Sequence, residues 1–503
     1  MPSDTIAAVA SGMTASGIGI IRISGPEAFS ILEKVFRPKR GANVREYKGN
    51  TVHYGHIVRG GSVRGDTVSG GTVSGSTVDG TVIDGSLRGS TVTDDTVSSG
   101  TVTGGTVIDE CLVTIFRAPH SYTAEDTAEI NTHGGVFVMQ RVLDTVLSAG
   151  ARAAEPGEFT KRAFLNGRID LTEAEAVMDV ISAKSDDALV SSLLQLSGSV
   201  RRRIEGLREK IMDELAFIEA ALDDPEHYEL SDYGETMLAH LAPVAAALRH
   251  LSGSFGEGHL IREGILTVIL GKPNAGKSSL LNALSGEDRA IVTEIEGTTR
   301  DILEEQVRLG ALSLRVIDTA GIRDAADRIE QIGIGRAKEY ASRADLILAL
   351  FDAATALDEN DRGILELIKD KRAILLLNKS DLAPVTTPEM LQAVSGKETQ
   401  VLTISAKDGS GLKELEEAVR ALFFSGGLRM NEEAVITSAR HKQAIDAALA
   451  SYALLEESVR SGMPEDVYAI DLTDMYKRLG EVIGEDIGDD LADAIFSRFC
   501  MGK

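Results

Sequence analysis

Gly271-Lys272-Pro273-Asn274-Ala275-Gly276-Lys277-Ser278 is a G-x-x-x-x-G-K-S motif, and it decides the fold of the central part of the chain. The apolar run 265–270 before it predicts a buried strand, and residues 279–284 after it predict the first turns of a helix. Glycines let backbone N–H groups turn inward around phosphate oxygens, and the helix N-terminus adds partial positive charge. Lys277 would reach the β- and γ-phosphates, and the Ser278 hydroxyl would ligate Mg²⁺.

Four further motifs accompany this phosphate loop, and each supplies a part that a guanine nucleotide site needs. The strand run 373–377 leads into Asn378-Lys379-Ser380-Asp381, whose carboxylate suits the N1–H and exocyclic amine of guanine. The other three are Gly297-Thr298-Thr299-Arg300-Asp301 with its switch threonine, Asp318-Thr319-Ala320-Gly321 after the run 312–317, and Ser405-Ala406-Lys407 after the run 401–404. Their order and strand-end placement match a Ras-like GTPase, so residues 263–424 are predicted to be a doubly wound α/β GTP-binding domain.

One position differs from Ras-type proteins, which place a Gln just after Asp-x-x-Gly to orient the attacking water. Here that residue is Ile322, which cannot polarise water. A carboxylate from the same segment is therefore the candidate catalytic group, and Glu330 is one of three that follow. Asn274 offers a side-chain oxygen near the α- and β-phosphates, where a monovalent cation would replace an arginine finger.

Composition limits the class of protein. The chain has 503 residues, 43% of them hydrophobic, which predicts several domains with real cores. The formal charge of −25 argues against broad, unaided nucleic-acid binding. Arg201-Arg202-Arg203 is a short basic cluster, for which a solvated helix face is the simpler interpretation. Two distant cysteines, Cys111 and Cys500, form neither a disulfide framework nor a metal site. With no secretory signal at the N-terminus and no apolar run of membrane-spanning length, the expected location is cytoplasmic.

Residues 1 to about 120 are predicted to be strands and turns, but residues 60–108 differ in kind. Val or Leu recurs every five residues from Val63 to Val107, with one shortened unit, and Ser or Thr precedes most of these residues. Such a period fits a squared-off β-solenoid; a disordered loop expanded by repeat slippage is the competing interpretation. Either way the segment is an insertion, because the flanking residues Ile57-Val58 and Ile108-Asp109-Glu110 would otherwise join a hairpin.

Helical periodicity appears on both sides of the GTPase segment. One apolar stripe comprises Leu207, Ile211, Leu215, Ile218 and Leu222, and residues 236–261 continue in helix. Residues 436–499 return to helix, with Ile445, Leu449, Leu454, Leu479, Ile483, Ile487, Leu491 and Ile495 as their apolar positions. The prediction is one helical bundle built from both flanks, with the GTPase domain inserted. The chain ends Phe499-Cys500-Met501-Gly502-Lys503, where Cys500 is either a chemically active thiol or a buried helix-end thiol.

These features together resemble the MnmE (TrmE) family of tRNA modification GTPases over almost the whole chain outside 60–108. The N-terminal blocks that carry the resemblance are Asp4-Thr5-Ile6, Gly19-Ile20-Ile21-Arg22-Ile23-Ser24-Gly25, Ser121-Tyr122-Thr123-Ala124-Glu125-Asp126, His133-Gly134-Gly135, Pro156-Gly157-Glu158-Phe159-Thr160 and Arg162-Ala163-Phe164-Leu165-Asn166-Gly167. The ending Cys500-Met501-Gly502-Lys503 is similar to the family's Cys-x-Gly-Lys. The chain departs from the family at Ser11-Gly12-Met13-Thr14, where a Pro-rich turn is usual, and at Ala124, where Gly is usual.

The resemblance implies a multidomain protein that combines α+β and α/β parts. An N-terminal α+β domain, 1–155, would bind tetrahydrofolate and dimerise, and it carries the pentad-repeat insertion 60–108. The helical bundle would comprise 156–262 and 425–503, with the Ras-like P-loop GTPase domain 263–424 inserted. Arg22, Glu129, Arg168 and Lys503 match the folate-contacting positions, with Arg168 where Lys is usual.

The family's GTPase is K⁺-activated, so the resemblance also implies ligands for two metal ions. Ser278 and Thr299 would bind Mg²⁺, and Asn274, Thr293, Ile295 and Thr298 would surround K⁺. Glu330 would position water, and Cys500 would be the second catalytic residue. The implied GTP-binding residues are Asn274, Ala275, Gly276, Lys277, Ser278, Ser279, Thr293, Glu294, Ile295, Glu296, Gly297, Thr298, Thr299, Asp318, Thr319, Ala320, Gly321, Asn378, Lys379, Asp381, Ser405, Ala406 and Lys407.

The implied reaction adds an aminomethyl-type (carboxymethylaminomethyl) group to C5 of the wobble uridine, position 34, of certain tRNAs. A homodimer would act with the flavoprotein MnmG in a heterotetramer, in which MnmG alone carries FAD. The one-carbon unit would come from 5,10-methylene- or 5-formyl-tetrahydrofolate. The alternatives are an Era-like ribosome-assembly GTPase, which would need a basic KH-like domain, and a purely regulatory GTPase. A HydF-type maturation GTPase would need a cluster-binding set of cysteines, which two distant ones cannot supply.

Overall fold

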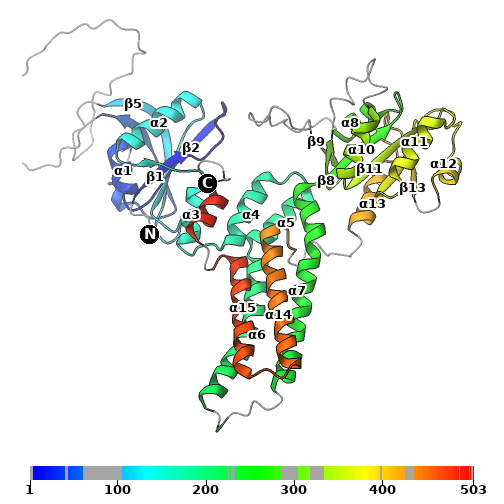
Figure 1. Ribbon diagram of the computed structural model, residues 1–503. Helices are drawn as coiled ribbons and strands as arrows, with labels where there is room; N and C mark the ends of the chain where they lie inside the picture. Colours follow the sequence, from blue (N-terminus) through cyan, green and yellow to red (C-terminus); the bar gives the residue numbers. More distant parts are fainter. Residues whose placement is uncertain are drawn as a thin grey trace, which may run out of the picture. The chain divides into compact units, whose positions relative to one another are not determined.

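The computed structural model describes residues 4–39, 43–60, 105–224, 226–227, 233–285, 304–317, 333–396, 399–424, 435–485, 488–497, 499 and 502. They form two compact units (Figure 1). One comprises Met1–Ala174 with Asp486–Lys503, and the other comprises Glu175–Glu485. Among the described helices, none combines the length and the apolar composition that crossing a bilayer requires.

The first unit is built on a seven-stranded mixed sheet in the order β3-β4-β5-β6-β2-β1-β7. The strands are β1 (Ile6–Val9), β2 (Ile18–Ser24), β3 (Phe36–Pro38), β4 (Thr51–Arg59), β5 (Thr106–Phe116), β6 (Thr127–His133) and β7 (Arg152–Ala153). Helices α1 (Ala28–Val35) and α2 (Val136–Ser148) pack against each other and against this sheet. The prediction of strands and turns alone up to residue 120 was therefore wrong at α1 and at the short helix η1 (Val44–Glu46).

The two faces of this sheet differ because side chains alternate along each strand. Ile21 and Ile23 of β2 and Val113 and Ile115 of β5 are fully buried on one face, beneath the helices. On the other face, Ile18, Val52, Tyr54 and Leu112 are 42–64% exposed although they are apolar. Within the described part of the chain, Tyr122 and Phe159 lie over Arg22 on this second face, whereas the four apolar side chains remain exposed.

Strands β4 and β5 form the hairpin that the sequence predicts around the repeat insertion. Their antiparallel pairing runs from Thr51↔Ile115 to Arg59↔Thr106, and it includes Ile57↔Asp109. Of the predicted insertion 60–108, residues 61–104 lie outside the described residues. Thr106, Val107 and Ile108 belong to β5, so the prediction that the insertion extends to residue 108 was wrong. A Cβ on Gly105 would come within 2.5 Å of the Gly60 carbonyl oxygen, so the two ends of the insertion are adjacent.

Removing residues 61–104 and joining Gly60 directly to Gly105 is expected to leave GTP hydrolysis and oligomeric state unchanged. The pair Arg59↔Thr106 would then be closed by a two-residue Gly-Gly loop, and Gly60 already has φ 70°, as a type I′ hairpin turn requires. GTPase assays and size-exclusion chromatography with light scattering are the measurements. Insoluble protein, or a change in subunit number, would show that the insertion belongs to the core or to an interface.

The second unit contains a helical bundle built from both flanks of the inserted domain, as the sequence predicts. Figure 1 shows α6 (Ser199–Asp223), α7 (Tyr233–Glu263), α14 (Ala439–Arg460) and α15 (Glu465–Ile483) running side by side. All four contribute to one hydrophobic core. The shorter helices α4 (Leu171–Ser182) and α5 (Asp186–Leu196) precede them. Arg202 and Arg203 are exposed on α6, as expected of a solvated helix face.

Two parts of the helical prediction were wrong. The stripe of α6 is buried from Leu207 to Ile218, but Leu222 is 47% exposed, and the buried residue of that turn is Ala221 instead. The last helix, α16 (Asp489–Phe496), does not join the bundle: it lies in the first unit and packs against α3 (Glu158–Leu165), with Phe496 near Phe164. A helical spacing marks one apolar face, but it does not say which neighbour covers that face.

The inserted domain is a six-stranded sheet in the order β13-β12-β11-β8-β10-β9, parallel except at β9. Its strands are β8 (Ile265–Gly271), β9 (Glu304–Leu309), β10 (Leu312–Ile317), β11 (Leu346–Asp352), β12 (Ala373–Asn378) and β13 (Gln400–Thr403). Its helices are α8 (Lys277–Ser285), α10 (Gly333–Arg343), α11 (Glu359–Ile368), α12 (Pro388–Ser395) and α13 (Leu412–Phe423). This is the doubly wound α/β fold that the motifs predict.

Candidate functional site

The loop between β8 and α8 has the backbone conformation that a phosphate loop needs. Gly276 has φ 101°, and Asn274 has φ 65° although it is not glycine. A Cβ on Gly276 would lie 2.2 Å from the Asn378 amide nitrogen, so no other residue fits there without a shift. The loop leads into α8 at Lys277, which places it at the positive end of that helix. The arrangement is a cradle for an anion.

Lys277 is held at the centre of this cradle. Its Nζ donates to the carbonyl oxygens of Gly271, at 2.7 Å, and Lys272, at 2.9 Å. Burial lowers the pKa of Lys277 below its usual value. The ammonium group is thus oriented by backbone acceptors. To bind a phosphate, it would exchange these carbonyl acceptors for phosphate oxygens.

Asn378 connects the phosphate loop to the loops on the base side. Its side-chain amide donates to the Ala275 carbonyl at 2.8 Å, and its Oδ1 accepts from the Ala406 N–H at 2.9 Å. Asp381 Oδ1 accepts a hydrogen bond from the Ser405 hydroxyl at 3.2 Å, which orients that carboxylate. Residues from three separate sequence motifs therefore meet at the carboxyl ends of β8, β12 and β13, where doubly wound folds bind ligands.

Three other predicted GTPase residues are described: Ser279 lies in α8, Lys379 Nζ lies 2.6 Å from Asp352 Oδ2, and Lys407 Nζ lies 3.7 Å from Asp381 Oδ2. Many of the others cannot be placed. Thr293, Glu294, Ile295, Glu296, Gly297, Thr298, Thr299, Asp318, Thr319, Ala320, Gly321, Ile322 and Glu330 lie outside the described residues. Of the predicted cation ligands, the structure describes Ser278, in the first turn of α8, and Asn274, which is exposed. Their oxygen atoms are of the kind that Mg²⁺ and K⁺ prefer, so these residues fit such ions.

A second group of predicted residues comes together in the first unit. Arg22 and Glu129 are directly opposite each other on β2 and β6, and the Arg22 Nη2 lies 2.8 Å from Glu129 Oε1. The Arg22 Nη1 also donates to the Gly502 carbonyl at 3.1 Å. The C-terminal tail thus reaches this site, although Cys500 and Lys503 themselves lie outside the described residues.

Aromatic rings complete this second site. The Arg22 guanidinium carbon lies 5.4 Å from the centre of the Tyr122 ring and 5.5 Å from that of Phe159. Arg168, the third predicted folate residue, lies 4.8 Å from the Tyr122 ring. The prediction did not assign Tyr122 and Phe159 to the site, although both stand in the sequence blocks that carry the family resemblance. Beside them, Ala124 has φ 60°, the left-handed conformation that explains why glycine is usual there.

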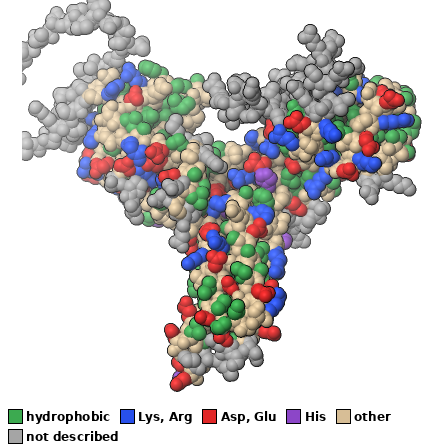
Figure 2. Space-filling model, in the orientation of Figure 1, with side chains coloured by type: hydrophobic (Ala, Val, Ile, Leu, Met, Phe, Trp, Pro, Cys, Tyr) green, Lys and Arg blue, Asp and Glu red, His purple; other side chains and the backbone are tan. Residues whose placement is uncertain are grey.

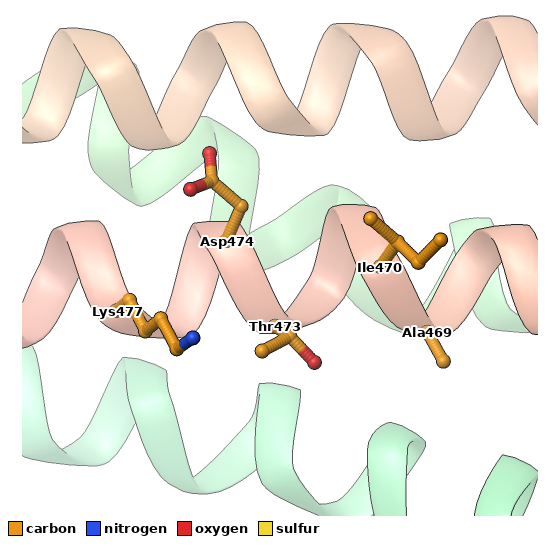
Figure 3. Close-up of a pocket in the computed structure, with 5 residues that line it drawn as sticks. All are labelled: Ala469, Ile470, Thr473, Asp474 and Lys477. Atoms are coloured by element: carbon orange, nitrogen blue, oxygen red, sulfur yellow. The ribbon is translucent and has the colours of Figure 1, made fainter.

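A shallow groove along α15 is separate from both sites. Figure 3 shows its lining residues, which are Ala469, Ile470, Thr473, Asp474 and Lys477, all on that helix. Asp474 accepts a hydrogen bond from the Ser451 hydroxyl of α14 at 2.7 Å. None of the predicted site residues lies in this groove.

Comparison with known proteins agrees with the family resemblance over the whole chain. Two family models match, the MnmE helical domain over residues 171–500 and the GTP-binding protein TrmE N-terminus over residues 5–168. The tRNA modification GTPase MnmE of Lachnoclostridium phytofermentans is 45% identical over 504 residues, with 100% of each chain covered. Those of Acetivibrio thermocellus and Carboxydothermus hydrogenoformans are each 40% identical, with 99% and 100% of each chain covered.

Proposed function

Because the chain belongs to the MnmE family of tRNA modification GTPases, we propose that it installs an aminomethyl-type group at C5 of the wobble uridine of certain tRNAs. Family membership and the nucleotide motifs make it a GTP hydrolase that acts in tRNA modification. The finer proposal is that hydrolysis is K⁺-activated and serves a carboxymethylaminomethyl-type modification. The observation that carries it is the presence, in one chain, of a GTP site and of an Arg–Glu–aromatic site at the C-terminal tail.

The proposed domains divide this work. Residues 1–155 bind a 5,10-methylene- or 5-formyl-tetrahydrofolate and dimerise, 263–424 hydrolyse GTP, and the helical parts 156–262 and 425–503 connect the two. In the GTPase domain, Lys277 binds the β- and γ-phosphates, and Ser278 and Thr299 hold Mg²⁺. The carboxylate of Asp381 recognises guanine.

The proposed hydrolysis relies on this chain's own groups to orient water and to stabilise charge. Glu330 positions the attacking water, a role that the apolar side chain of Ile322 cannot fill. Asn274, Thr293, Ile295 and Thr298 would hold K⁺, which supplies positive charge where an arginine finger would act. Asn274, held at φ 65°, fits this role because it is exposed and so accessible to an ion from solvent.

Replacing K⁺ with Na⁺ at equal ionic strength is expected to lower kcat for GTP hydrolysis about tenfold or more. Na⁺ is smaller and more strongly hydrated, so it would not fill the same ligand set. Steady-state hydrolysis in KCl and NaCl is the measurement, and Asn274→Ala should remove the difference between the two salts. Equal rates of the natural protein in both salts would contradict K⁺ activation.

Glu330→Ala separates catalysis from binding in the same assay. If Glu330 acts on water only in the transition state, the variant should lose kcat with little change in the Kd for GTP. A variant that fails to bind GTP would instead make Glu330 a structural residue.

The second site fits a tetrahydrofolate through its chemistry. A folate has a planar heterocycle that can stack on Tyr122 and carboxylates that can pair with Arg22 or Arg168. Glu129 Oε1 accepts a hydrogen bond from Arg22 Nε at 2.9 Å and so holds the guanidinium in the site. Lys503 is the fourth proposed contact. The group would supply the one-carbon unit, and these side chains would bind and orient it.

The proposed homodimer would bury the exposed apolar part of the second face of the N-terminal sheet. Val52, Thr114, Glu129 and Arg22 pair in register across four strands, so they share this face with Ile18, Tyr54 and Leu112. Exposed apolar side chains in a contiguous patch are typical of protein interfaces. The same face thus carries Arg22 and Glu129 of the proposed folate site and the proposed subunit contact.

The proposed partner is the flavoprotein MnmG, with which the homodimer would form a heterotetramer. Of the two proteins, MnmG alone would carry FAD. The proposed location is the cytoplasm. The family implies a tRNA substrate, yet the chain has a formal charge of −25. On the face drawn in Figure 2, Lys and Arg side chains lie among Asp and Glu rather than in one basic field. The proposed partner would therefore contribute positive surface for the tRNA phosphates.

A further inference from the structure

Lys272, the second residue of the phosphate loop, makes an ion pair outside that loop. Its Nζ lies 2.9 Å from Asp358 Oδ2 and 2.7 Å from Asp361 Oδ2. The Asp361 side chain is only 3% exposed, and its Oδ1 has no hydrogen-bond partner. Burial opposes the charged form of Lys272, but its hydrogen bonds to Asp361 and Asp358 raise its pKa. Lys272 therefore stays positively charged at neutral pH.

The two carboxylates are fixed by the backbone at the start of α11. Asp358 is the N-cap residue, and its Oδ1 accepts from the N–H groups of Asn360 and Asp361. Asp361 in turn accepts from the Asp358 N–H at 3.0 Å, which completes a capping box. Because both acceptors are held in this way, the Lys272 ammonium is attached to a rigid helix end.

The other end of the same segment is attached to the base-side loop. Lys379 Nζ lies 2.6 Å from Asp352, the last residue of β11. The Ala353 carbonyl accepts from the N–H groups of Val385 and Thr386, which follow the Asn-Lys-x-Asp motif. Residues 352–361, the β11–α11 segment, thus carry one lysine contact from the phosphate loop and one from the base-side loop.

Lys272 also touches the phosphate lysine through its own backbone. Its carbonyl oxygen accepts from Lys277 Nζ at 2.9 Å and from the Ala275 N–H at 3.3 Å. The residue whose side chain is fixed by α11 therefore presents its carbonyl to the ammonium group that is proposed to bind phosphate. A displacement of Lys272 would move that acceptor.

We propose that Lys272 is a positioning residue for GTP binding, which holds the phosphate loop against the β11–α11 segment and so sets the spacing between Lys277 and the base-side loop. The inference rests on the proposed binding of the GTP phosphates by residues 271–278. A bound nucleotide contacts the phosphate loop and the base-side loop at the same time. If the distance between these two loops changes, the contacts at one end of the nucleotide are weakened.

Two effects of Lys272 must be separated experimentally. Lys272→Met removes the attachment, but it also leaves Asp361 buried with an uncompensated charge, which destabilises proteins. The double variant Lys272→Met/Asp361→Asn removes both charges, and the side-chain amide oxygen that it introduces on α11 can still accept the Asp358 N–H. It should regain thermal stability without regaining the attachment.

The experiment measures the Kd of a fluorescent GDP analogue, the KM and kcat for GTP, and the melting temperature of each full-length variant. We expect Lys272→Met and the double variant both to bind about tenfold more weakly and to raise KM more than they lower kcat. Lys369→Met, which removes an exposed lysine from the end of the same helix, is the matched control and should behave as the natural protein does. Lys272→Arg, which keeps the charge, should recover part of the affinity.

The outcomes distinguish the inference from the site on which it rests. Natural affinity in the double variant would overturn the proposal, because Lys272 would then serve only to neutralise Asp361. Natural affinity in Lys272→Met would overturn it as well. If Lys277→Ala also bound the analogue normally, the proposed phosphate site itself would be wrong. Loss of binding in Lys277→Ala together with normal binding in the Lys272 variants would refute the positioning role alone.

Discussion

Replacing Asp381 with Asn is expected to weaken GTP binding by about a hundredfold or more. The proposed contacts are two hydrogen bonds from guanine, N1–H and the exocyclic amine, to one carboxylate. Hydrogen bonds to a charged group contribute about 1.5–3 kcal/mol each, so losing both costs about 3 kcal/mol at least. The amide group introduced by the substitution would also present a donor towards the donors of guanine.

The same substitution should improve binding of xanthosine triphosphate, which carries an oxygen where guanine carries the amine. Competition of GTP and xanthosine triphosphate against a fluorescent nucleotide is the measurement. Asp370→Asn, which removes the same charge from an exposed position in the same domain, is the control and should change neither affinity. Unchanged GTP affinity in Asp381→Asn would mean that Asp381 does not contact the base.

Cys500→Ser is expected to abolish wobble-uridine modification in cells while leaving GTP hydrolysis and folding unchanged. Cys500 lies far in sequence from every nucleotide motif, but only two residues from Gly502, whose carbonyl accepts from Arg22. Two residues span about 7 Å at most, so the proposed reactive thiol belongs to the tail that reaches the folate site. A neighbouring cation such as Lys503 would favour the thiolate.

Cys111 provides the contrast within the same chain. Its side chain is 3% exposed, and burial, together with the nearby Asp109 and Glu110, raises the pKa of the thiol to about 12. It therefore stays protonated and cannot serve as a nucleophile, so Cys111→Ser should leave modification intact if the protein folds. The readout is the level of modified uridine in tRNA from complemented strains. Natural levels with Cys500→Ser would remove Cys500 from the mechanism and leave the tail as a contact through Lys503.

The GTPase fold could be predicted from the sequence because each of its signals is local. A strand, a glycine-rich turn and a helix follow one another within residues 265–285, and the apolar strands are nearly continuous because they are buried on both sides. The hairpin around the insertion was predictable for a similar reason, since its two strands adjoin the insertion on either side. Domain boundaries and site assignments remain predictions.

Features that depend on contacts between residues far apart in the sequence could not be predicted from the spacing of residues along the chain. The Arg22–Glu129 pair depends on the register of β2 against β6, and only the family resemblance brought these residues together. Lys272 and Asp361 are 89 positions apart, and nothing in either local pattern indicates the ion pair. Helix α1 has only eight residues, so its stability comes from packing against the sheet rather than from a long periodic pattern.

The central claim is that this GTPase acts in the modification of tRNA wobble uridines. The most direct test is mass spectrometry of nucleosides from the tRNA of a strain that lacks the gene, with and without the natural gene restored. The proposed function predicts that aminomethyl-type uridines disappear in the first strain and return in the second. Natural levels of these nucleosides in the strain without the gene would contradict the claim.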